Sequence, residues 1–278
     1  MTRIVVDSTS DLPTATMEEL GIIMVPLKVH FGTEEFRDRV ELEEDEFFRK
    51  LGEATELPKT SQPSPGDFLE AYKQVPDHEA ILSIHLSEKL SGTYQSALLA
   101  AKELPGRDIR VIDTGNVTAA AGLLVLVAAD MLRDGRSPAE VEQALVEMRG
   151  RTRLLAILDT LKYAVMGGRV SKVQGALGGL LRVKAVMLVH QGEIDRLPPA
   201  RTWGQAFQKV ADDIRVHGGA ERISVIDAQA PDSRAALRAE LQKSFPGVPI
   251  TEGTLGAVIG THAGPGAVGC AYIAKKAG

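Results

Sequence analysis

The sequence has little cysteine, few aromatic residues and no long run of basic residues. Cys270 is the one cysteine among 278 residues, which excludes an intramolecular disulfide and a thiolate metal cluster. The 32 Lys and Arg residues are scattered, with no aromatic residues interleaved among them, so we expect no nucleic-acid partner. The six histidines show no metal-ligand spacing, and we expect neither a metal site nor a cofactor.

Long apolar runs are also missing. The most apolar stretch, residues 117–132, is rich in alanine, contains Asp130 and falls short of the ~20 residues that a membrane-spanning helix needs. We interpret it as a buried helix. The N-terminal residues lack the basic start and apolar core of a signal peptide. These features predict a cytoplasmic protein.

The overall composition is that of a globular protein with a sizeable core, since 44% of the residues are hydrophobic and 25% are charged. A domain typically has roughly 100–200 residues, so the length suggests two domains. The pattern of strands and helices changes near Gly150. We therefore predict an N-terminal domain of residues 1–150 and a C-terminal domain of residues 151–278.

The N-terminal half alternates short apolar runs with helical patterns, which is typical of an α/β domain with a parallel sheet flanked by helices. The predicted strands are residues 3–6, 22–29, 81–84 and 109–112. Residues 38–58 are acidic and helix-prone. Residues 59–66 follow Pro58 and contain two further prolines, so they form neither a helix nor a central strand and are expected to be a fixed loop or a crossing.

The C-terminal half mixes hairpins with helices, which predicts an α+β domain with a mixed or antiparallel sheet. Gln191-Gly192 has the residue types of a tight hairpin turn. The predicted strands are residues 154–158, 185–189, 193–197, 223–226 and 268–273, and the predicted helices are residues 204–217 and 233–245.

Hydroxyl groups are frequent where the predicted parallel strands end, and ligands of open parallel sheets bind at that edge. Ser91-Gly92-Thr93 is equally consistent with a helix cap and with an anion site made of a hydroxyl and backbone amides. For Asp11 and Asn116 we favour simple helix N-caps. Thr60-Ser61 would face solvent in an ordinary loop, but the nearby prolines restrict this one and favour a binding role.

Glycines surround the other two candidate positions. Gly264, Gly266 and Gly269 match G-x-G-x-x-G, but they follow no first strand of a βαβ unit, so we reject a dinucleotide site and expect a sharp turn that places His262. Gly167-Gly168 precedes Arg169, which either caps a helix C-terminus or binds a carboxylate or phosphate. No nucleophile elbow, phosphate-binding loop or zinc-protease motif is present.

Five motifs in order give the chain a resemblance to a known family. They are VVDSTSDL at 5–12, TSQPS at 60–64, LSGTYQSA at 90–97, GGRVS at 167–171 and HAGPG at 262–266. Together they resemble the DegV family of bacterial fatty-acid-binding proteins, from residue 4 to about residue 273. The resemblance implies two α/β domains with a long-chain fatty acid in a tunnel between them.

The resemblance also implies the roles of individual residues. The carboxylate would be held by hydroxyl and backbone groups, without a lysine, and His262 would lie close by. These groups would come from Thr60, Ser61, Ser91, Gly92 and Thr93. Some members of the family are the lipid-binding subunit of a two-component fatty acid kinase, in which a separate ATP-binding protein phosphorylates the bound acid. Arg169 would then engage that partner or the new phosphate. The protein would not be an enzyme itself, and transient contact with a membrane is compatible with its role.

Two alternatives stay open at this point. An acyl hydrolase would use Ser91 or Ser61 with His262, although no third residue to orient the histidine is evident. A carrier of another anionic amphiphile would need the same features as a fatty acid carrier. The sequence does not define the length or unsaturation of the acyl chain, which depend on the shape of the tunnel.

Overall fold

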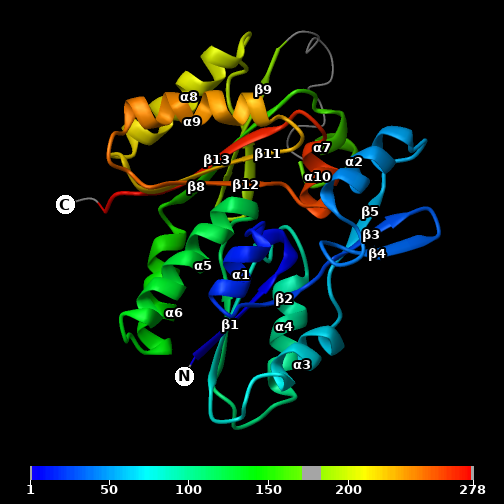
Figure 1. The fold of residues 1–278 in the computed structure, drawn as a ribbon, viewed down its shortest axis with the longest axis vertical. Coiled ribbons are helices and arrows are strands. Elements are labelled where there is room, and N and C mark those ends of the chain that lie inside the picture. The colour runs from blue at the N-terminus through cyan, green and yellow to red at the C-terminus, as the bar shows by residue number, and fades with distance from the viewer. Residues whose placement is uncertain (1, 171–182, 277–278) are drawn as a thin grey trace.

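The computed structural model describes residues 2–170 and 183–276, and this part of the chain forms three β-sheets with helices around them (Figure 1). The first sheet is parallel throughout, in the order β2-β1-β6-β7. Its strands are β1 (Thr2–Asp7), β2 (Ile23–Val25), β6 (Ala80–His85) and β7 (Ile109–Asp113). The short η1 (Ser8–Ser10) and α1 (Thr14–Glu19) follow β1.

Helices cover both faces of this parallel sheet, which is why its strands are apolar on both sides. On one face α3 and α4 pack against Val5 and Ile81, and on the other α5 and α6 pack against Val6 and Leu82. The helices are α3 (Pro65–Lys73), α4 (Thr93–Lys102), α5 (Thr118–Arg133) and α6 (Pro138–Arg149). The buried helix predicted for residues 117–132 is thereby confirmed as α5.

The second sheet is mixed, as predicted, in the order β10-β9-β8-β13-β11-β12. Its neighbouring strands are antiparallel except for β11 and β12. The strands are β8 (Thr152–Leu158), β9 (Ala185–His190), β10 (Glu193–Arg196), β11 (Ala220–Asp227), β12 (Ile250–Thr254) and β13 (Val268–Ala274). Helices α8 (Trp203–Val216) and α9 (Pro231–Ser244) cover one face, and the opposite face is turned toward α5 (Figure 1).

A third, antiparallel sheet in the order β4-β3-β5 was not predicted. It consists of β3 (Lys28–Phe31), β4 (Glu34–Arg37) and β5 (Lys59–Ser61), and α2 (Glu44–Glu53), α7 (Lys162–Met166) and α10 (Ala257–Ala263) lie near it. The prediction of one strand over residues 22–29 is wrong. Pro26 separates β2 from β3, because proline has no amide hydrogen for a strand ladder and because Leu27 then carries the chain into the other sheet.

The proline-rich segment is an edge strand followed by a helix start. Residues Lys59–Ser61 pair only along one side with β3, which agrees with the expectation that this segment is not a central strand. Ser64 then caps α3 in a reciprocal capping box with Asp67, and Pro65 occupies the first turn. Thr60 and Ser61 are therefore held by β pairing, which is firmer than the fixed loop we predicted.

The largest apolar core joins the two main sheets. It contains Val6 and Leu82 of the parallel sheet together with Leu154, Ile226 and Ala271 of the mixed sheet. All strands of the parallel and third sheets precede Gly150, and all strands of the mixed sheet follow it. The division into domains at residues 150 and 151 remains a prediction. Within the described ranges, no helix has the length and apolar character that crossing a membrane requires.

Candidate functional site

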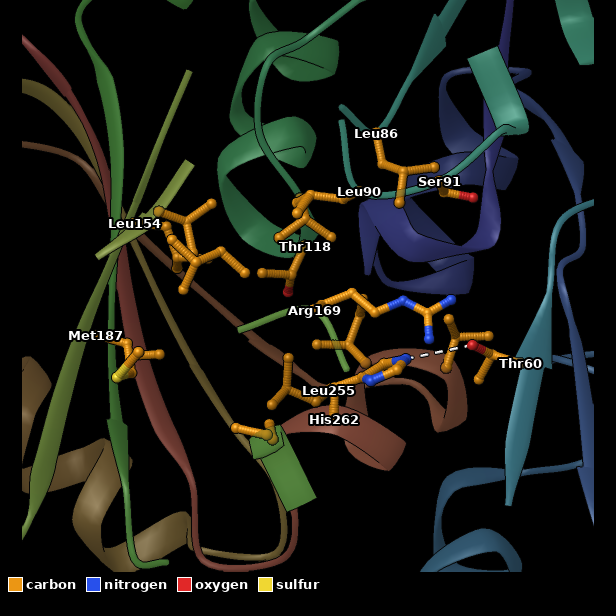
Figure 2. A pocket seen from close by; sticks show the side chains of 18 of the residues that line it. Thr60, Leu86, Leu90, Ser91, Thr118, Leu154, Arg169, Met187, Leu255 and His262 are labelled. Atoms are coloured by element: carbon orange, nitrogen blue, oxygen red, sulfur yellow. Dashed lines mark hydrogen bonds between the residues drawn. The ribbon is translucent and has the colours of Figure 1, made fainter. Parts of the chain in front are cut away.

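A cavity of about 680 Å³ lies between the loops of the parallel sheet and the open face of the mixed sheet. Its volume is in the usual range for sites that bind small organic molecules, roughly 300–1,000 Å³. The apolar part is formed by side chains such as Leu86, Leu154, Met187 and Leu255. In Figure 2, Leu154 and Met187 lie on the side of the cavity opposite Thr60. The cavity therefore has an apolar body and one polar end.

The polar end is formed where β5, α10 and the turn after α7 meet. The Oγ1 atom of Thr60 lies 3.2 Å from Nε2 of His262, although 202 positions separate the two residues in the sequence. The guanidinium of Arg169 and the ring of His262 both point toward Thr60 (Figure 2). The structure thus brings together Thr60, Arg169 and His262, three of the residues that the sequence motifs singled out.

His262 is neutral at physiological pH because of its surroundings. Burial and, to a lesser extent, the nearby positive charge of Arg169 together lower the pKa of its imidazole to about 4. Its Nδ1 atom is buried and has no hydrogen-bond partner among the described residues. A neutral ring that shares one hydrogen bond with Thr60 can take part in binding an anion without itself carrying charge.

Gly167 of one predicted motif makes room for His262, and Gly264 of another makes room for Tyr163. A Cβ atom on Gly167 would lie 2.1 Å from Nδ1 of His262, and one on Gly264 would lie 2.1 Å from the ring of Tyr163. Gly264 and Gly266 have φ angles of +75° and +81° and turn the chain between α10 and β13. The expected sharp turn is confirmed, but His262 itself lies in a helix that we did not predict.

Arg169 caps a helix and also lines the cavity, and its binding of a carboxylate or phosphate stays a prediction. Its Nη1 atom donates to the carbonyl of Gly167 at 2.7 Å, which caps the C-terminus of α7. The same side chain lines the cavity and carries the positive charge nearest to His262. Ser171, the last residue of that motif, lies outside the described residues. This capping bond uses one of the five N–H donors of the guanidinium.

The remaining candidate hydroxyls differ in their neighbours. Ser61 lines the cavity, and its Oγ lies 2.9 Å from Nε2 of His30. Ser91 also lines the cavity, and its Oγ accepts from the backbone N–H of Thr93 and lies 2.9 Å from Oγ1 of that residue. Thr93 is buried behind Ser91 and does not line the cavity. Ser91 therefore both forms hydrogen bonds at the start of α4 and contributes to the cavity wall.

Gly92 has an ordinary φ angle of −74° and lies close to the side chain of Gln62. A Cβ atom there would lie 2.3 Å from Oε1 of Gln62. Gln62 lines the cavity as well, and its Nε2 donates to Oγ of Ser96 at 3.3 Å. The motifs at 60–64 and 90–97 are thus in contact through Gln62, a residue that we did not single out although it lies inside one of them.

One lysine lines the cavity, and the absence of a lysine from the carboxylate site itself stays a prediction. Lys89 lines the cavity together with Glu88, and its Nζ lies 2.8 Å from Oε1 of Glu193. This ion pair joins the loop after β6 to β10 across the cavity. Both partners are about half exposed, so the pair contributes little to stability, yet it places a positive charge in the cavity wall.

Two buried carboxylates hold the other end of α10. Asp11 accepts from the backbone N–H of Gly256 at 2.9 Å and from Thr118 Oγ1 at 2.6 Å, and Asp38 accepts from the N–H of Ala257 at 3.1 Å. Burial raises the pKa of Asp11 to about 7 and that of Asp38 to about 6. Asp38 has no motif that would have identified it.

The predicted N-caps of Asp11 and Asn116 are wrong. Asp11 has a φ of +50° and supports a helix 245 residues further along the chain, instead of the helix that follows it. Asn116 donates to the carbonyls of Thr114 and Thr152, which joins the end of the parallel sheet to β8. Both side chains make contacts between segments that are remote in sequence, and local patterns do not reveal such contacts.

A second histidine takes part in a fully buried network. Nδ1 of His85 lies 3.1 Å from Oδ2 of Asp7, and its Nε2 lies 2.6 Å from Oγ of Ser83. The order of groups resembles a catalytic triad, but all three side chains are buried and none lines the cavity. Asp7 also accepts from the backbone N–H of Leu86 at 3.0 Å, so the network positions the cavity wall.

The arrangement favours binding over hydrolysis. His262 contacts Thr60, while Ser61 contacts His30, so neither serine pairs with His262 as the predicted hydrolase alternative requires. No cluster of three or more metal-binding side chains occurs in the part of the chain that the structure covers. What remains is a largely apolar cavity with Thr60, Arg169 and His262 grouped at one end.

Comparisons with known proteins agree with this architecture. A family model described as "Uncharacterised protein, DegV family" matches residues 1–275. A fatty acid-binding protein of Thermotoga maritima is 36% identical over 276 residues, with 96% of each chain covered. The solved structure of a DegV family protein from Thermus thermophilus, described by its fatty acid binding, shares 37% identity and a TM-score of 0.89 over 98% of this chain and 100% of that one.

A third relative is known by its ligand. The solved structure of a stearic acid-binding protein from Eubacterium ventriosum is 26% identical and has a TM-score of 0.89 with 98% of both chains covered. The three-sheet fold, the motifs at the polar end and the full-length matches all agree. The chain belongs to the DegV family.

Proposed function

We propose that this protein binds one long-chain fatty acid in the cavity and acts as a carrier, without catalysing a reaction itself. The observation that supports this most directly is the lining of the site, a largely apolar cavity of about 680 Å³ with Thr60, Arg169 and His262 grouped at one end. The fatty acid binding named for the relatives from Thermus thermophilus and Thermotoga maritima supports the same ligand class.

The carboxylate of the acid would lie at the polar end. Thr60, Ser61 and Ser91 would donate hydroxyl hydrogens to it, and the neutral ring of His262 would share the hydrogen bond of Thr60. The glycine backbone at Gly92 would approach it closely. Thr93 would act one step away, by holding the hydroxyl of Ser91.

We further propose that a separate ATP-binding kinase phosphorylates the bound carboxylate. The groups at the polar end bind an anion without attacking it, so the carboxylate stays available as a nucleophile toward ATP bound to the partner. Arg169 would engage the partner or neutralise the new acyl phosphate, because guanidinium groups match phosphate oxygens. A cytoplasmic location, with transient membrane contact for exchange of the acid, would suit this role.

Extraction of the purified protein followed by mass spectrometry tests the ligand class. We expect a free fatty acid at about one per chain. Thr60→Ala combined with Ser91→Ala should keep the fold and weaken retention, whereas Thr33→Ala with Thr55→Ala, at exposed positions, should not. Turnover of acyl esters that Ser91→Ala abolishes would instead establish the hydrolase, and another anionic amphiphile in the extract would replace the fatty acid in the proposal.

Phosphorylation assays with a fatty acid kinase and ATP test the presentation step. Arg169→Ala should lower acyl-phosphate formation while retention of the acid stays close to that of the unmodified protein. Loss of the bound acid from the Arg169→Ala protein would contradict this division of roles, because it would make Arg169 a part of the carboxylate site itself.

A further inference from the structure

The floor of the cavity is a row of small residues that runs across the mixed sheet. Strand register places Met187 beside Ala156, Ala156 beside Gly269, Gly269 beside Ile226, and Ile226 beside Gly253. These residues share one face of the sheet because paired residues of neighbouring strands point to the same side. The row is therefore a transverse groove, low at Ala156, Gly269 and Gly253, and interrupted by one large side chain.

A second cavity of about 340 Å³ lies beyond that side chain, over the edge of the sheet. Ile226 belongs to the lining of both cavities, Gly269 to the first and Gly253 to the second. Ile226 is buried, and its Cγ2 occupies the space next to Gly269, where an added Cβ would lie 2.9 Å away. Because both cross-strand neighbours of Ile226 are glycines, its side chain alone forms the ridge between the two cavities at this row.

The second cavity has an apolar wall that an acyl chain could use. Ala119, Leu123 and Leu126 of α5 line it, opposite Gly253 of β12. Its polar neighbour Asp11 already accepts hydrogen bonds from Gly256 and Thr118. Polar residues, among them Ser224, Thr251 and Glu252, line the other side of this cavity. Methylene groups entering it would contact the apolar side chains of α5 and would leave the hydrogen bonds of Asp11 in place.

The rest of the partition is rigid. Thr118 lines the first cavity, Asp11 lines the second, and their side chains are joined at 2.6 Å. Their φ angles are +51° and +50°, a conformation that is unusual for residues other than glycine and especially for β-branched threonine. Among the described residues Ile226 alone lines both cavities, so its side chain is the part of the partition to remove by substitution.

On the basis of the proposed function, we propose that Ile226 determines the length of fatty acid that the protein accepts, by closing the acyl cavity off from the second one. Long-chain fatty acids that fit the first cavity end against this side chain. Longer or terminally branched acids would need the second cavity, and they are excluded while Ile226 is present.

Competition among fatty acids tests the inference. The lipid-free protein is mixed with an equimolar series of saturated acids from myristic to behenic, and the retained acids are measured by mass spectrometry. Ile226→Ala should shift retention toward the longer acids, by about tenfold for each two methylenes that enter the second cavity. Ile223→Ala is the matched control, because Ile223 is a buried isoleucine of the same strand that packs in the other core.

Refilling the second cavity checks the route. Gly253→Val adds bulk there, and an added Cβ would lie 3.5 Å or more from its neighbours. Ile226→Ala combined with Gly253→Val should return retention to the shorter acids. Where Ile226→Ala does not fold, Ile226→Val should give a smaller shift in the same direction.

The outcomes separate the two proposals. If the unmodified protein retains fatty acid and Ile226→Ala retains the same distribution of chain lengths, the role of Ile226 is overturned and the proposed function is not. An equal shift in Ile223→Ala, or no reversal by Gly253→Val, would also overturn it, because the effect would then reflect general loosening or another route. An unmodified protein that retains no fatty acid would overturn the proposed function, and the role of Ile226 with it.

Discussion

The two ends of the cavity are built in different ways. The polar end is assembled from side chains on separate segments, each held by one or two hydrogen bonds, such as Thr60 to His262 and Arg169 to Gly167. The apolar end is a sheet face on which strand register fixes the position of Ala156, Gly269 and Ile226. The polar end can therefore be altered by a small displacement of one group, whereas the apolar end changes only with the volume of its side chains.

The energies at the two ends differ as well. Burial of ~15 methylene groups at about 0.8 kcal/mol each would contribute ~12 kcal/mol before the costs of ordering. A hydrogen bond to a charged group contributes only about 1.5–3 kcal/mol. The apolar end should supply most of the affinity, and the polar end should decide which end of the acid faces the opening.

Filling the apolar end should have the largest effect. Ala156 lies on the floor of the cavity, and Ala156→Trp would place an indole where the acyl chain is proposed to lie. We expect fatty acid retention to fall below detection, whereas Thr60→Ala should lower affinity about 10- to 100-fold through one lost hydrogen bond. Fluorescent fatty acid displacement measures both, and thermal unfolding verifies the fold. A greater loss from Thr60→Ala than from Ala156→Trp would reverse the comparison.

Displacing one group at the polar end should have an intermediate effect. Gly167 has a helical φ of −68°, so alanine is acceptable to its backbone, but the new Cβ would lie 2.1 Å from Nδ1 of His262. Gly167→Ala should push the ring away from Thr60 and weaken fatty acid binding by about tenfold, the value of one hydrogen bond. Gly204→Ala is the control, because Gly204 is a helical glycine with no neighbour within 4 Å of an added Cβ. Equal affinities of the two variants would show that the position of the ring does not matter.

The sequence reveals much more of the polar end than of the apolar end. Thr60, Ser61, Ser91, Arg169 and His262 stand in short motifs of unusual residues, and all of them line the cavity. Thr93 was also predicted to belong to the site, but it does not line the cavity. A hydroxyl near a helix start can face a cavity or form a hydrogen bond with a neighbouring side chain, and the sequence spacing is the same in both cases. Whether these side chains hold a carboxylate remains a prediction.

The apolar end has no comparable signal. Alternation along a strand predicts which residues face inward, but not whether side chains or an open cavity lie opposite them. Gly269 lies in the strand predicted for residues 268–273, but nothing in the sequence indicates that it lines a cavity. Strand β12 was missed because Ile250 is its one large apolar residue, and helix α10 was missed because glycine and β-branched residues are common in it.

The smallest effect on binding is expected at the far end of α10, from Asp11→Asn. Burial raises the folded-state pKa of Asp11 from 3.8 to about 7, so the folded protein binds this proton more tightly than the unfolded chain does. Its contribution to stability is full below 3.8 and is lost as the pH rises toward 7. His262 acts in the opposite direction, since its pKa is lowered from 6.5 to about 4 and its contribution is lost as the pH falls through that range.

Chemical denaturation at a series of pH values separates these two contributions. An asparagine at position 11 keeps an oxygen for the N–H of Gly256 and cannot ionise, so the Asp11→Asn protein should gain stability relative to the unmodified protein as the pH rises from 3.8 to about 7. His262→Gln should remove the loss on the acidic side. Fatty acid retention should change little in Asp11→Asn, because the Asp11 side chain lies outside the first cavity. A stability difference between Asp11→Asn and the unmodified protein that stays constant with pH would mean that burial does not raise the pKa of Asp11 in the folded state. The two ends of α10 would then no longer respond to pH in opposite directions.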